Sequence, residues 1–265
     1  MPELITSLQN DMLKRVRALE QKKARVSQGA FVAEGEGQLN RAREHGWQAE
    51  LLVSTSDWAT DTGLVRWVVE QGGKHICIPS TLMPRLTGVD NPPPVLAVLH
   101  SRELSALTAD GIWLALEEIR DPGNLGTILR TAEAAGVSGV VLVGETCDPF
   151  SRECVRAATG SLFAMPMLRQ SREGFLGLVR NWPGDVIGTK MNADADYRDP
   201  VKRPAMIVMG SESKGMSVEV SQACTKLVSI PMAPGVESLN VAIASALMLY
   251  AQAGFPLTSK AHSTS

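Results

Sequence analysis

The chain has 265 residues, of which 44% are hydrophobic and 20% charged, and its formal net charge is −2. This composition is typical of a globular protein with a full core, and the length favours about two domains. No apolar run reaches the roughly 20 residues that a membrane helix needs, and the mixed, charged N-terminal segment does not resemble a signal peptide, so a cytoplasmic location is expected.

The cysteines and histidines do not form a metal-binding pattern. No two cysteines have the CxxC spacing, and the four histidines lie far from them in the sequence. A zinc site needs closely spaced ligands, so no structural metal is predicted. We expect each cysteine to be a small buried or half-buried residue: Cys77, Cys147, Cys154 and Cys224.

The first 105 residues are predicted to form a small alternating α/β unit. Residues 11–25 have helix-forming composition, with three apolar side chains near one face. A strand ending near Ala33 and a helix over 38–44 follow, and Gly46 closes that helix. Further strands are expected at 50–54, 75–79 and 95–99, with a helix over 64–73. The polar segment after the last strand places the domain boundary near residue 105, giving domains 1–105 and 106–265.

A basic stretch lies near the N-terminus. The stretch from Lys14 to Arg25 contains six basic residues and a single acidic residue, Glu20. Such a stretch can follow a phosphate backbone, and it can equally be a solvated helix face, so the composition leaves both readings open. Neither half of the chain is broadly basic, which means that any affinity for nucleic acid depends on local patches.

The second unit alternates apolar strands and helices in a longer series. Strands are expected at 112–119, 139–144, 185–190, 205–210 and 227–232. Helices are expected at 125–136, around 154–162, and over the very apolar stretch 239–254; the polar tail 254–265 is expected to be disordered. Continuous apolar strands that alternate with helices indicate a mainly parallel sheet covered on both faces.

Three loops that follow these strands carry glycines and polar residues: IRDPGN, GSESKG and PMAPGVESLN. In a parallel sheet such loops emerge at one edge, where ligands usually bind. Taken singly each has a structural explanation, since Asn124 could simply cap a helix and Arg130 could be a surface arginine.

The three loops, in this order along the chain, resemble the motifs of a known protein family. The strings DPGNLGTILRTAEAAG, IVMGSESKGMS and IPMAPGVESLNVAIASALMLY are similar to the three motifs of the SPOUT superfamily, in its TrmH (SpoU) branch of RNA 2′-O-ribose methyltransferases. The resemblance covers residues 112–253. Residues 1–105 also resemble the ribosomal-protein-like RNA-binding domain common in this branch, which favours the RNA-binding reading of the basic stretch.

The resemblance implies a trefoil-knotted α/β domain, a cofactor and a homodimer. S-adenosyl-L-methionine is expected to bind through backbone groups at Gly210, Ile230, Met232 and Leu239, whose side chains offer no hydrogen bonds. The last helix is expected either in the core or at a dimer contact near the active site. No metal is implied.

The polar motif positions are the expected catalytic residues: Asn124, Arg130, Glu212, Ser238 and Asn240. Arg130 matches the arginine that the family places at its catalytic centre, and both a general base and an electrostatic stabiliser are possible roles. Because a guanidinium holds its proton up to a pH of about 12, we favour phosphate binding and stabilisation of the developing alkoxide. Asn124 would orient the ribose or the arginine.

Two other protein classes and a second RNA target remain as alternatives. A nicotinamide or flavin enzyme would need GxGxxG after the first strand, where the chain has DPGNLG. A non-catalytic RNA-binding protein on the same scaffold would be favoured if the polar motif residues were missing, and all are present. Ribosomal RNA is favoured over transfer RNA as the substrate.

Overall fold

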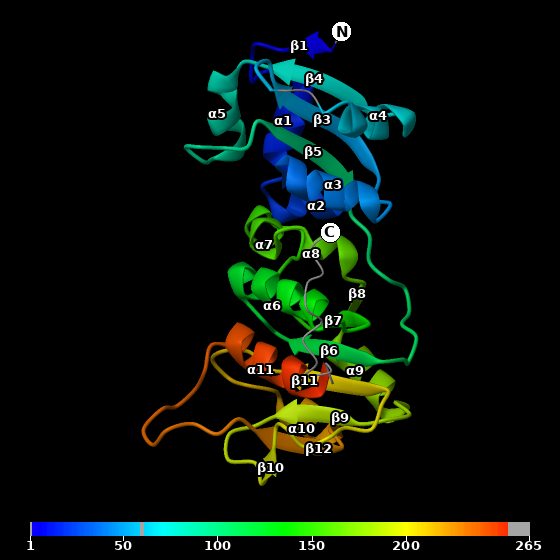
Figure 1. The fold of residues 1–265 in the computed structure, drawn as a ribbon, viewed down its shortest axis with the longest axis vertical. Helices are drawn as coiled ribbons and strands as arrows, with labels where there is room; N and C mark the ends of the chain where they lie inside the picture. Colours follow the sequence, from blue (N-terminus) through cyan, green and yellow to red (C-terminus); the bar gives the residue numbers. More distant parts are fainter. Residues whose placement is uncertain (1, 59–60, 254–265) are drawn as a thin grey trace, which may run out of the picture.

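Two β-sheets, one in each half of the chain, form the frame of the molecule (Figure 1). The computed structural model describes residues 2–58 and 61–253. The first sheet has the strand order β1-β4-β3-β5-β2, and the second has the order β10-β12-β9-β11-β6-β7-β8. The predicted boundary near residue 105 falls between the last strand of the first sheet and the first strand of the second, and it stays a prediction.

The N-terminal sheet is mixed. Its strand β5 runs antiparallel to both β2 and β3, whereas β3, β4 and β1 pair in parallel. The strands are β1 (Glu3–Leu4), β2 (Ala30–Glu34), β3 (Ala49–Thr55), β4 (Lys74–Ile78) and β5 (Val95–His100). The helices are α1 (Asp11–Ala18), α2 (Lys22–Gln28), α3 (Glu36–Glu44), α4 (Thr62–Glu70) and α5 (Met83–Thr87), with a short 3₁₀ turn before α5, η1 (Ser80–Leu82).

The C-terminal sheet is parallel throughout its described strands, as the alternation of apolar runs and helices predicts. Its strands are β6 (Ile112–Glu117), β7 (Gly139–Val143), β8 (Met167–Gln170), β9 (Val186–Thr189), β10 (Ala195–Asp196), β11 (Ala205–Met209) and β12 (Lys226–Ser229). The helices are α6 (Pro122–Ala134), α7 (Arg152–Ala158), α8 (Ser161–Ala164), α9 (Arg172–Arg180), α10 (Val218–Ala223) and α11 (Val241–Ala253).

Both faces of this sheet are covered by helices. Alternate side chains of β6, such as Leu114 and Leu116, pack with α6 and α11 in one core, and Trp113 and Ala115 pack with α9 and α10 in another. The period of two along each strand therefore divides the apolar residues between two layers. The α/β class expected for this domain is confirmed; the trefoil knot implied by the resemblance stays a prediction.

The single helix predicted over residues 11–25 is wrong. The chain breaks after α1 and resumes as α2, with Gln21 in an extended conformation between them. The break places Arg25 inside the molecule, where its Nη1 donates hydrogen bonds of 2.8 Å to the carbonyl oxygens of Leu19 and Glu20. The guanidinium thus satisfies carbonyls that the interrupted helix leaves without partners, which local composition could not indicate.

Other element boundaries also differ from the sequence prediction. The helix expected around 154–162 is two short helices, because Thr159 and Gly160 both have positive φ (48° and 96°). The strand expected over 227–232 ends at Ser229. Two further elements, β8 and α9, lie in a stretch for which the sequence predicts no strand or helix. The tail 254–265 lies outside the described residues.

Charged side chains join the two halves of the molecule. Arg156 donates to both carboxylate oxygens of Glu34, at 3.0 Å each, and Arg25 pairs with Asp148 at 2.8 Å. Arg152, on the same helix as Arg156, donates to carbonyl oxygens of α1 and α5 in the N-terminal half. Figure 1 shows α7 and α8 lying between the two sheets.

The basic stretch near the N-terminus is partly structural. Arg25 is buried, whereas Lys14, Arg17, Lys22 and Lys23 are exposed.

The cysteines are buried or half-buried, as predicted. Within the described part of the chain, no group of three metal-ligating side chains occurs and no helix is long and apolar enough to span a membrane.

Three thiols are expected to resist alkylation at pH 8. Burial, followed by the charges of Asp121 and Asp148, raises the pKa of Cys147 to about 11, and burial raises the pKa of Cys224 to about 12 and that of Cys154 well above its usual value. Because the thiolate is the reactive form, on the order of one Cys147 in a thousand is ionised at pH 8. Mass spectrometry after iodoacetamide treatment should find all three modified only in denaturant. Rapid native labelling of Cys147 would show that its loop opens.

Candidate functional site

Three loops that are distant in the sequence meet at the edge of the parallel sheet where β6 and β11 end. Asn124 lies in the first turn of α6, Glu212 in the loop after β11, and Asn240 just before α11. The side-chain amide of Asn124 donates to Glu212 Oε1 at 2.8 Å, and its Oδ1 accepts from Asn240 Nδ2 at 3.0 Å. The three predicted polar residues thus form one hydrogen-bonded chain.

Asn124 is free for these contacts because another residue caps α6. The carboxylate of Asp121 accepts the backbone N–H of Asn124 at 2.6 Å, and Pro122 occupies the first helical position. The predicted start of this helix at residue 125, with Asn124 as a possible cap, is wrong: the helix begins at Pro122 and Asp121 caps it. Proline suits this position since the first helical N–H has no partner within the helix.

Asn240 has a double role. Its Oδ1 accepts the backbone N–H of Ala242 at 2.8 Å at the start of α11, while its amide group reaches Asn124. The acceptor and the donor of one amide are therefore both used, which fixes the orientation of the side chain. This links the start of α11 directly to the start of α6.

Arg130 lies further along α6 with its side chain in solvent. It forms no ion pair or hydrogen bond with the described residues, and these include Asn124, Glu212 and Asn240. An exposed guanidinium that no carboxylate neutralises is available to a phosphate or to a developing oxyanion.

Gly210 stands where the backbone folds back on itself. A Cβ added there would lie 2.1 Å from Gly215 C and 2.1 Å from Met216 N, so no side chain fits. Ser211 and Gly215 close the loop through two backbone hydrogen bonds of 3.1 and 2.9 Å, and Gly215 has φ +67°. The result is a tight hairpin that carries Glu212. We call residues 210–217 the Gly210 hairpin.

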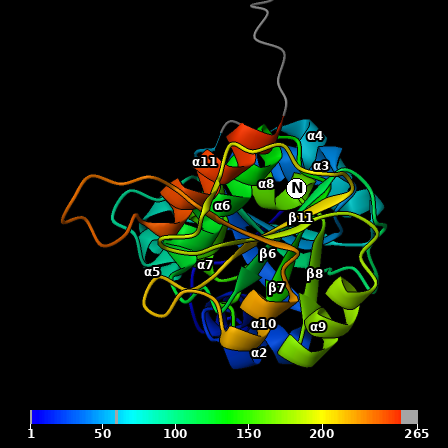
Figure 2. The ribbon, with the colours of Figure 1, turned by 90° about the horizontal axis from the view of Figure 1, so that it is seen from below.

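The segment between β12 and α11 extends from the body of the protein (Figure 2). Ile230 and Met232 are half-buried, whereas Ser238 and Leu239 are exposed. The backbone groups of Ile230, Met232 and Leu239 have no hydrogen-bond partner in the described chain. Unpaired backbone donors and acceptors in this segment fit a ligand that is recognised by main-chain groups, as expected for S-adenosylmethionine.

Gly210→Ala is expected to weaken cofactor binding by at least about tenfold, which corresponds to roughly 1.4 kcal/mol. The new methyl group would collide with backbone atoms of Gly215 and Met216, so the hairpin must move. Calorimetric titration with S-adenosylhomocysteine measures the effect. Gly177→Ala is the control, because Gly177 lies within α9 with open space around it. Equal affinities for the two variants would contradict this role of Gly210.

Sequence reasoning missed three residues beside this site. The buried carboxylate of Glu117, at the end of β6, contacts Arg172 and the backbone of Ser217. The only signal in the sequence was an acid at the end of an otherwise apolar strand, in LALEEI. Arg172 and Ser217 carried no signal of their own.

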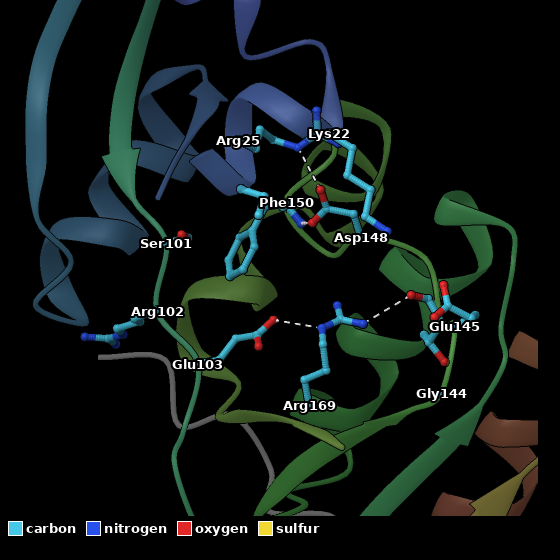
Figure 3. A pocket seen from close by; sticks show the side chains of 12 residues that line it. Lys22, Arg25, Ser101, Arg102, Glu103, Gly144, Glu145, Asp148, Phe150 and Arg169 are labelled. Atoms are coloured by element: carbon cyan, nitrogen blue, oxygen red, sulfur yellow. Dashed lines mark hydrogen bonds and ion pairs between the residues drawn. The ribbon is translucent and has the colours of Figure 1, made fainter. Parts of the chain in front are cut away.

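A separate cleft of about 490 Å³ lies between the two halves (Figure 3). Lys22 and Arg102 line it, but its other arginines are paired, Arg25 with Asp148 and Arg169 with Glu103. None of the motif residues lines this cleft. The arrangement at the sheet edge, not this cleft, is the candidate active site.

Comparisons with known proteins identify the family of this chain. Residues 111–250 match the SpoU rRNA Methylase family, and residues 10–97 match the MRM3-like substrate binding domain. The chain is 30% identical to the 23S rRNA (guanosine(2553)-2′-O)-methyltransferase RlmP of Bacillus subtilis, over 93% of this chain and 97% of that protein. It is similar to the crystal structure of an AdoMet-bound rRNA methyltransferase from Sinorhizobium meliloti, with 38% identity, a TM-score of 0.88, and coverage of 94% and 96%. The AdoMet complex of AviRb from Streptomyces viridochromogenes is also similar, with 28% identity, a TM-score of 0.81, and coverage of 92% and 98%.

Proposed function

Since the chain belongs to the SpoU rRNA methylase family, we propose that it transfers the methyl group of S-adenosylmethionine to a ribose 2′-hydroxyl of ribosomal RNA, with Asn124, Arg130, Glu212 and Asn240 at the reacting centre. The enzyme class and the cofactor follow from the family and from relatives crystallised with AdoMet. Ribosomal RNA is named for both the Bacillus subtilis and the Sinorhizobium meliloti relatives. Transfer RNA is the alternative substrate.

One observation carries the assignment of the site. The hydrogen-bonded chain from Glu212 through Asn124 to Asn240 connects all three motif loops at one edge of the sheet. Asn124 is 88 positions from Glu212 and 116 positions from Asn240 in the sequence, so no local structural need brings them together. A structural cap or turn would account for each residue singly but not for the chain of contacts.

The cofactor would lie against the Gly210 hairpin and the segment that carries Ile230, Met232 and Leu239. When bound, S-adenosylmethionine supplies a methyl group on a positively charged sulfur that leaves readily. The protein then has to align the 2′-hydroxyl with that methyl group, and alignment alone supplies a large part of the rate. Ser238, on the same exposed segment, is proposed to contact the substrate.

Arg130 is proposed to hold a phosphate next to the reacting ribose and to stabilise the negative charge that develops on the 2′-oxygen as its proton leaves. Its exposure and its lack of hydrogen-bond or ion-pair partners over residues 2–58 and 61–253 support this role. Asn124, six residues earlier on the same helix, is held by hydrogen bonds on both sides and would orient the ribose. The exposed residues Lys14, Arg17 and Lys23 are proposed contacts for more distant RNA phosphates.

The homodimer is proposed through the outer face of α11. The helix is apolar all round: Met248 and Leu249 are buried, whereas Ile243 and Leu247 are 53% and 37% exposed. Exposed apolar side chains on one helix face are typical of protein–protein contacts. A dimer through this face would lie next to Asn240, at the start of the same helix.

Ile243→Glu is expected to convert the dimer to a monomer at micromolar concentration, because a carboxylate would be buried without a partner in the interface. Size-exclusion chromatography with light scattering measures the mass. Val69→Glu, which adds a charge at a 52% exposed valine of α4, is the control. A monomeric wild type, or a dimer in both variants, would contradict the α11 contact.

The reaction is tested with methyl-labelled S-adenosylmethionine and separate pools of unmodified ribosomal and transfer RNA, followed by digestion and identification of labelled nucleosides. We expect label on a ribose in ribosomal RNA. Label in the transfer RNA pool alone would support the alternative substrate. Cofactor binding without label in either pool would indicate an assembled ribosomal particle as the substrate, and neither binding nor label would favour a non-catalytic RNA-binding protein.

A further inference from the structure

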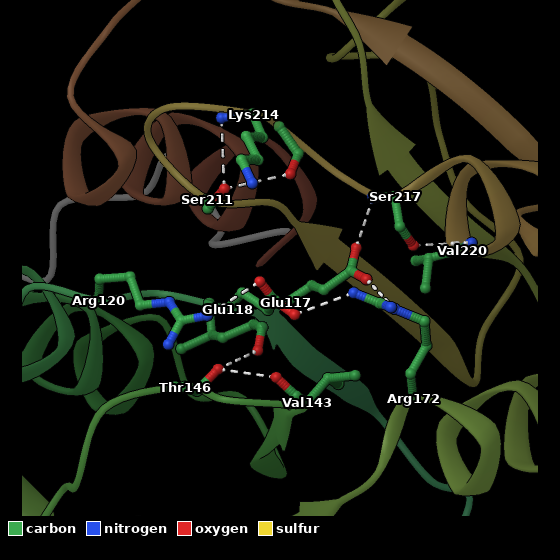
Figure 4. A network of polar contacts seen from close by, with 12 residues as sticks. Glu117, Glu118, Arg120, Val143, Thr146, Arg172, Ser211, Lys214, Ser217 and Val220 are labelled. Atoms are coloured by element: carbon green, nitrogen blue, oxygen red, sulfur yellow. Dashed lines mark hydrogen bonds and ion pairs between the residues drawn. The ribbon is translucent and has the colours of Figure 1, made fainter.

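A buried carboxylate lies beside the Gly210 hairpin and belongs to none of the three sequence motifs. Glu117, the last residue of β6, is 2% exposed. Its Oε2 accepts the backbone N–H of Ser217 at 2.8 Å, and its Oε1 accepts Nε of Arg172 at 2.9 Å (Figure 4). Burying a charged carboxylate is unfavourable unless such partners compensate it, so these two contacts account for its placement.

The strand register places this carboxylate next to the Gly210 hairpin. Leu116 of β6 is paired with Met209 of β11. The next residue of each strand is therefore Glu117 on one side and Gly210 on the other. The hairpin leaves the sheet at Gly210 and ends at Ser217, the N-cap of α10, which Glu117 holds.

Ser217 is fixed at its backbone and at its side chain. Its N–H is bound by Glu117, and its Oγ accepts the N–H of Val220 at the start of α10 at 3.3 Å. Between Gly210 and Ser217 the hairpin is closed by the two bonds between Ser211 and Gly215. Because Glu212 lies in this closed loop, the conformation of the loop sets the position of the Glu212 carboxylate, which accepts a hydrogen bond from Asn124.

Arg172, from α9, binds the other oxygen of this carboxylate. Its Nη2 also donates to Glu118 Oε1 at 2.9 Å, and Glu118 has a positive φ of 55°. The hydrogen bond to Glu117 raises the pKa of Arg172. The pair is thus a charge-assisted contact that keeps Oε2 directed at the Ser217 N–H.

We propose that Glu117 is a positioning residue for the methyl-transfer reaction: by holding Ser217 to the end of β6, it sets the Gly210 hairpin in the conformation that binds the cofactor and presents Glu212 to Asn124. This inference rests on the proposed function. Glu117 acts through the backbone of the hairpin and does not itself contact the reacting groups.

The proposal predicts a local effect that is separate from any loss of global stability. In Glu117→Ala, the dissociation constant for S-adenosylhomocysteine should rise at least about tenfold, and the KM for RNA should change little. Amide hydrogen exchange over residues 211–217 should become faster. Glu117→Gln, which keeps the shape and one acceptor, should fall between Ala and wild type.

Glu118→Gln is the matched control. It removes the charge of the neighbouring carboxylate and weakens a contact to the same arginine, but Glu118 has no contact with Ser217. Its cofactor affinity and its hairpin exchange should match the wild type. If Glu117→Ala does not fold, Arg172→Leu tests the same point, because it removes the hydrogen bond that directs the Glu117 carboxylate at the Ser217 N–H.

The outcomes separate this proposal from the one it rests on. A wild type that does not bind S-adenosylhomocysteine would overturn the proposed function and this inference with it. In a second outcome, the wild type binds S-adenosylhomocysteine while the Glu117 and Arg172 variants bind it with the same affinity as the wild type and show unchanged hydrogen exchange in the hairpin. That result would overturn the positioning role alone. Lower thermal stability without a change in cofactor affinity would likewise show that Glu117 serves only the fold.

Discussion

Arg130→Ala is expected to lower kcat for methyl transfer by about 10²- to 10³-fold, the usual effect of removing one donor that stabilises a developing oxyanion. The affinity for the cofactor and the thermal stability should stay at wild-type values, because Arg130 is exposed and has no hydrogen-bond or ion-pair partner in the described structure. Single-turnover kinetics with labelled cofactor and saturating ribosomal RNA measure the chemical step directly.

The replacement of Arg130 by lysine tests the geometry of the contact. Lysine keeps the charge but lacks the planar fork that binds phosphate through two parallel hydrogen bonds. We expect Arg130→Lys to recover only a small part of the lost rate. Near-full activity in this variant would exclude a specific forked contact.

The matched control is Arg180→Ala, which removes an exposed arginine at the end of α9. It should leave kcat unchanged, apart from a small effect on RNA affinity at low salt. If Arg130→Ala retained the rate of this control, the catalytic assignment would be wrong, and Arg130 would be an ordinary surface residue.

Glu34→Ala is expected to destabilise the protein by about 3–5 kcal/mol, the usual loss when one partner of a buried ion pair is removed. Glu34 is buried and pairs with Arg156 through two hydrogen bonds. Arg152, whose side chain is 5% exposed, lies 3.6 Å from the same carboxylate. Burial already lowers the pKa of Arg152, so the loss of Glu34 would leave a buried cation with less compensation.

Chemical denaturation monitored by tryptophan fluorescence measures this loss. Glu70→Ala, at an exposed position of α4, should change the free energy of unfolding by no more than about 0.5 kcal/mol. Similar stabilities for the two variants would mean that Glu34 contributes little to the junction between the halves. Since Arg152, Arg156 and Asp148 all join the N-terminal half to the C-terminal half, we expect the substrate-binding part to be held at a fixed distance from the active site.

The sequence by itself predicted the parallel sheet and the candidate residues of the site. Apolar runs of strand length located β6, β7 and β11, because a strand buried on both faces is apolar at every position. The order of the three motif loops located Asn124, Glu212 and Asn240 correctly relative to these strands. Both kinds of information are local, and both remain readable without coordinates.

Only the tertiary structure decided which groups meet. The break between α1 and α2 depends on Arg25, whose partner Asp148 is 123 positions away, and the bidentate pair of Glu34 and Arg156 spans 122 positions. The role inferred for Glu117 depends on Ser217, 100 positions further on. Periodicity and capping patterns report on neighbours within a few residues, whereas the burial of a charge is favourable only when a distant partner is delivered by the fold. The sequence therefore predicted the chemical groups of the candidate site, and the packing of segments distant in the sequence determined their hydrogen bonds.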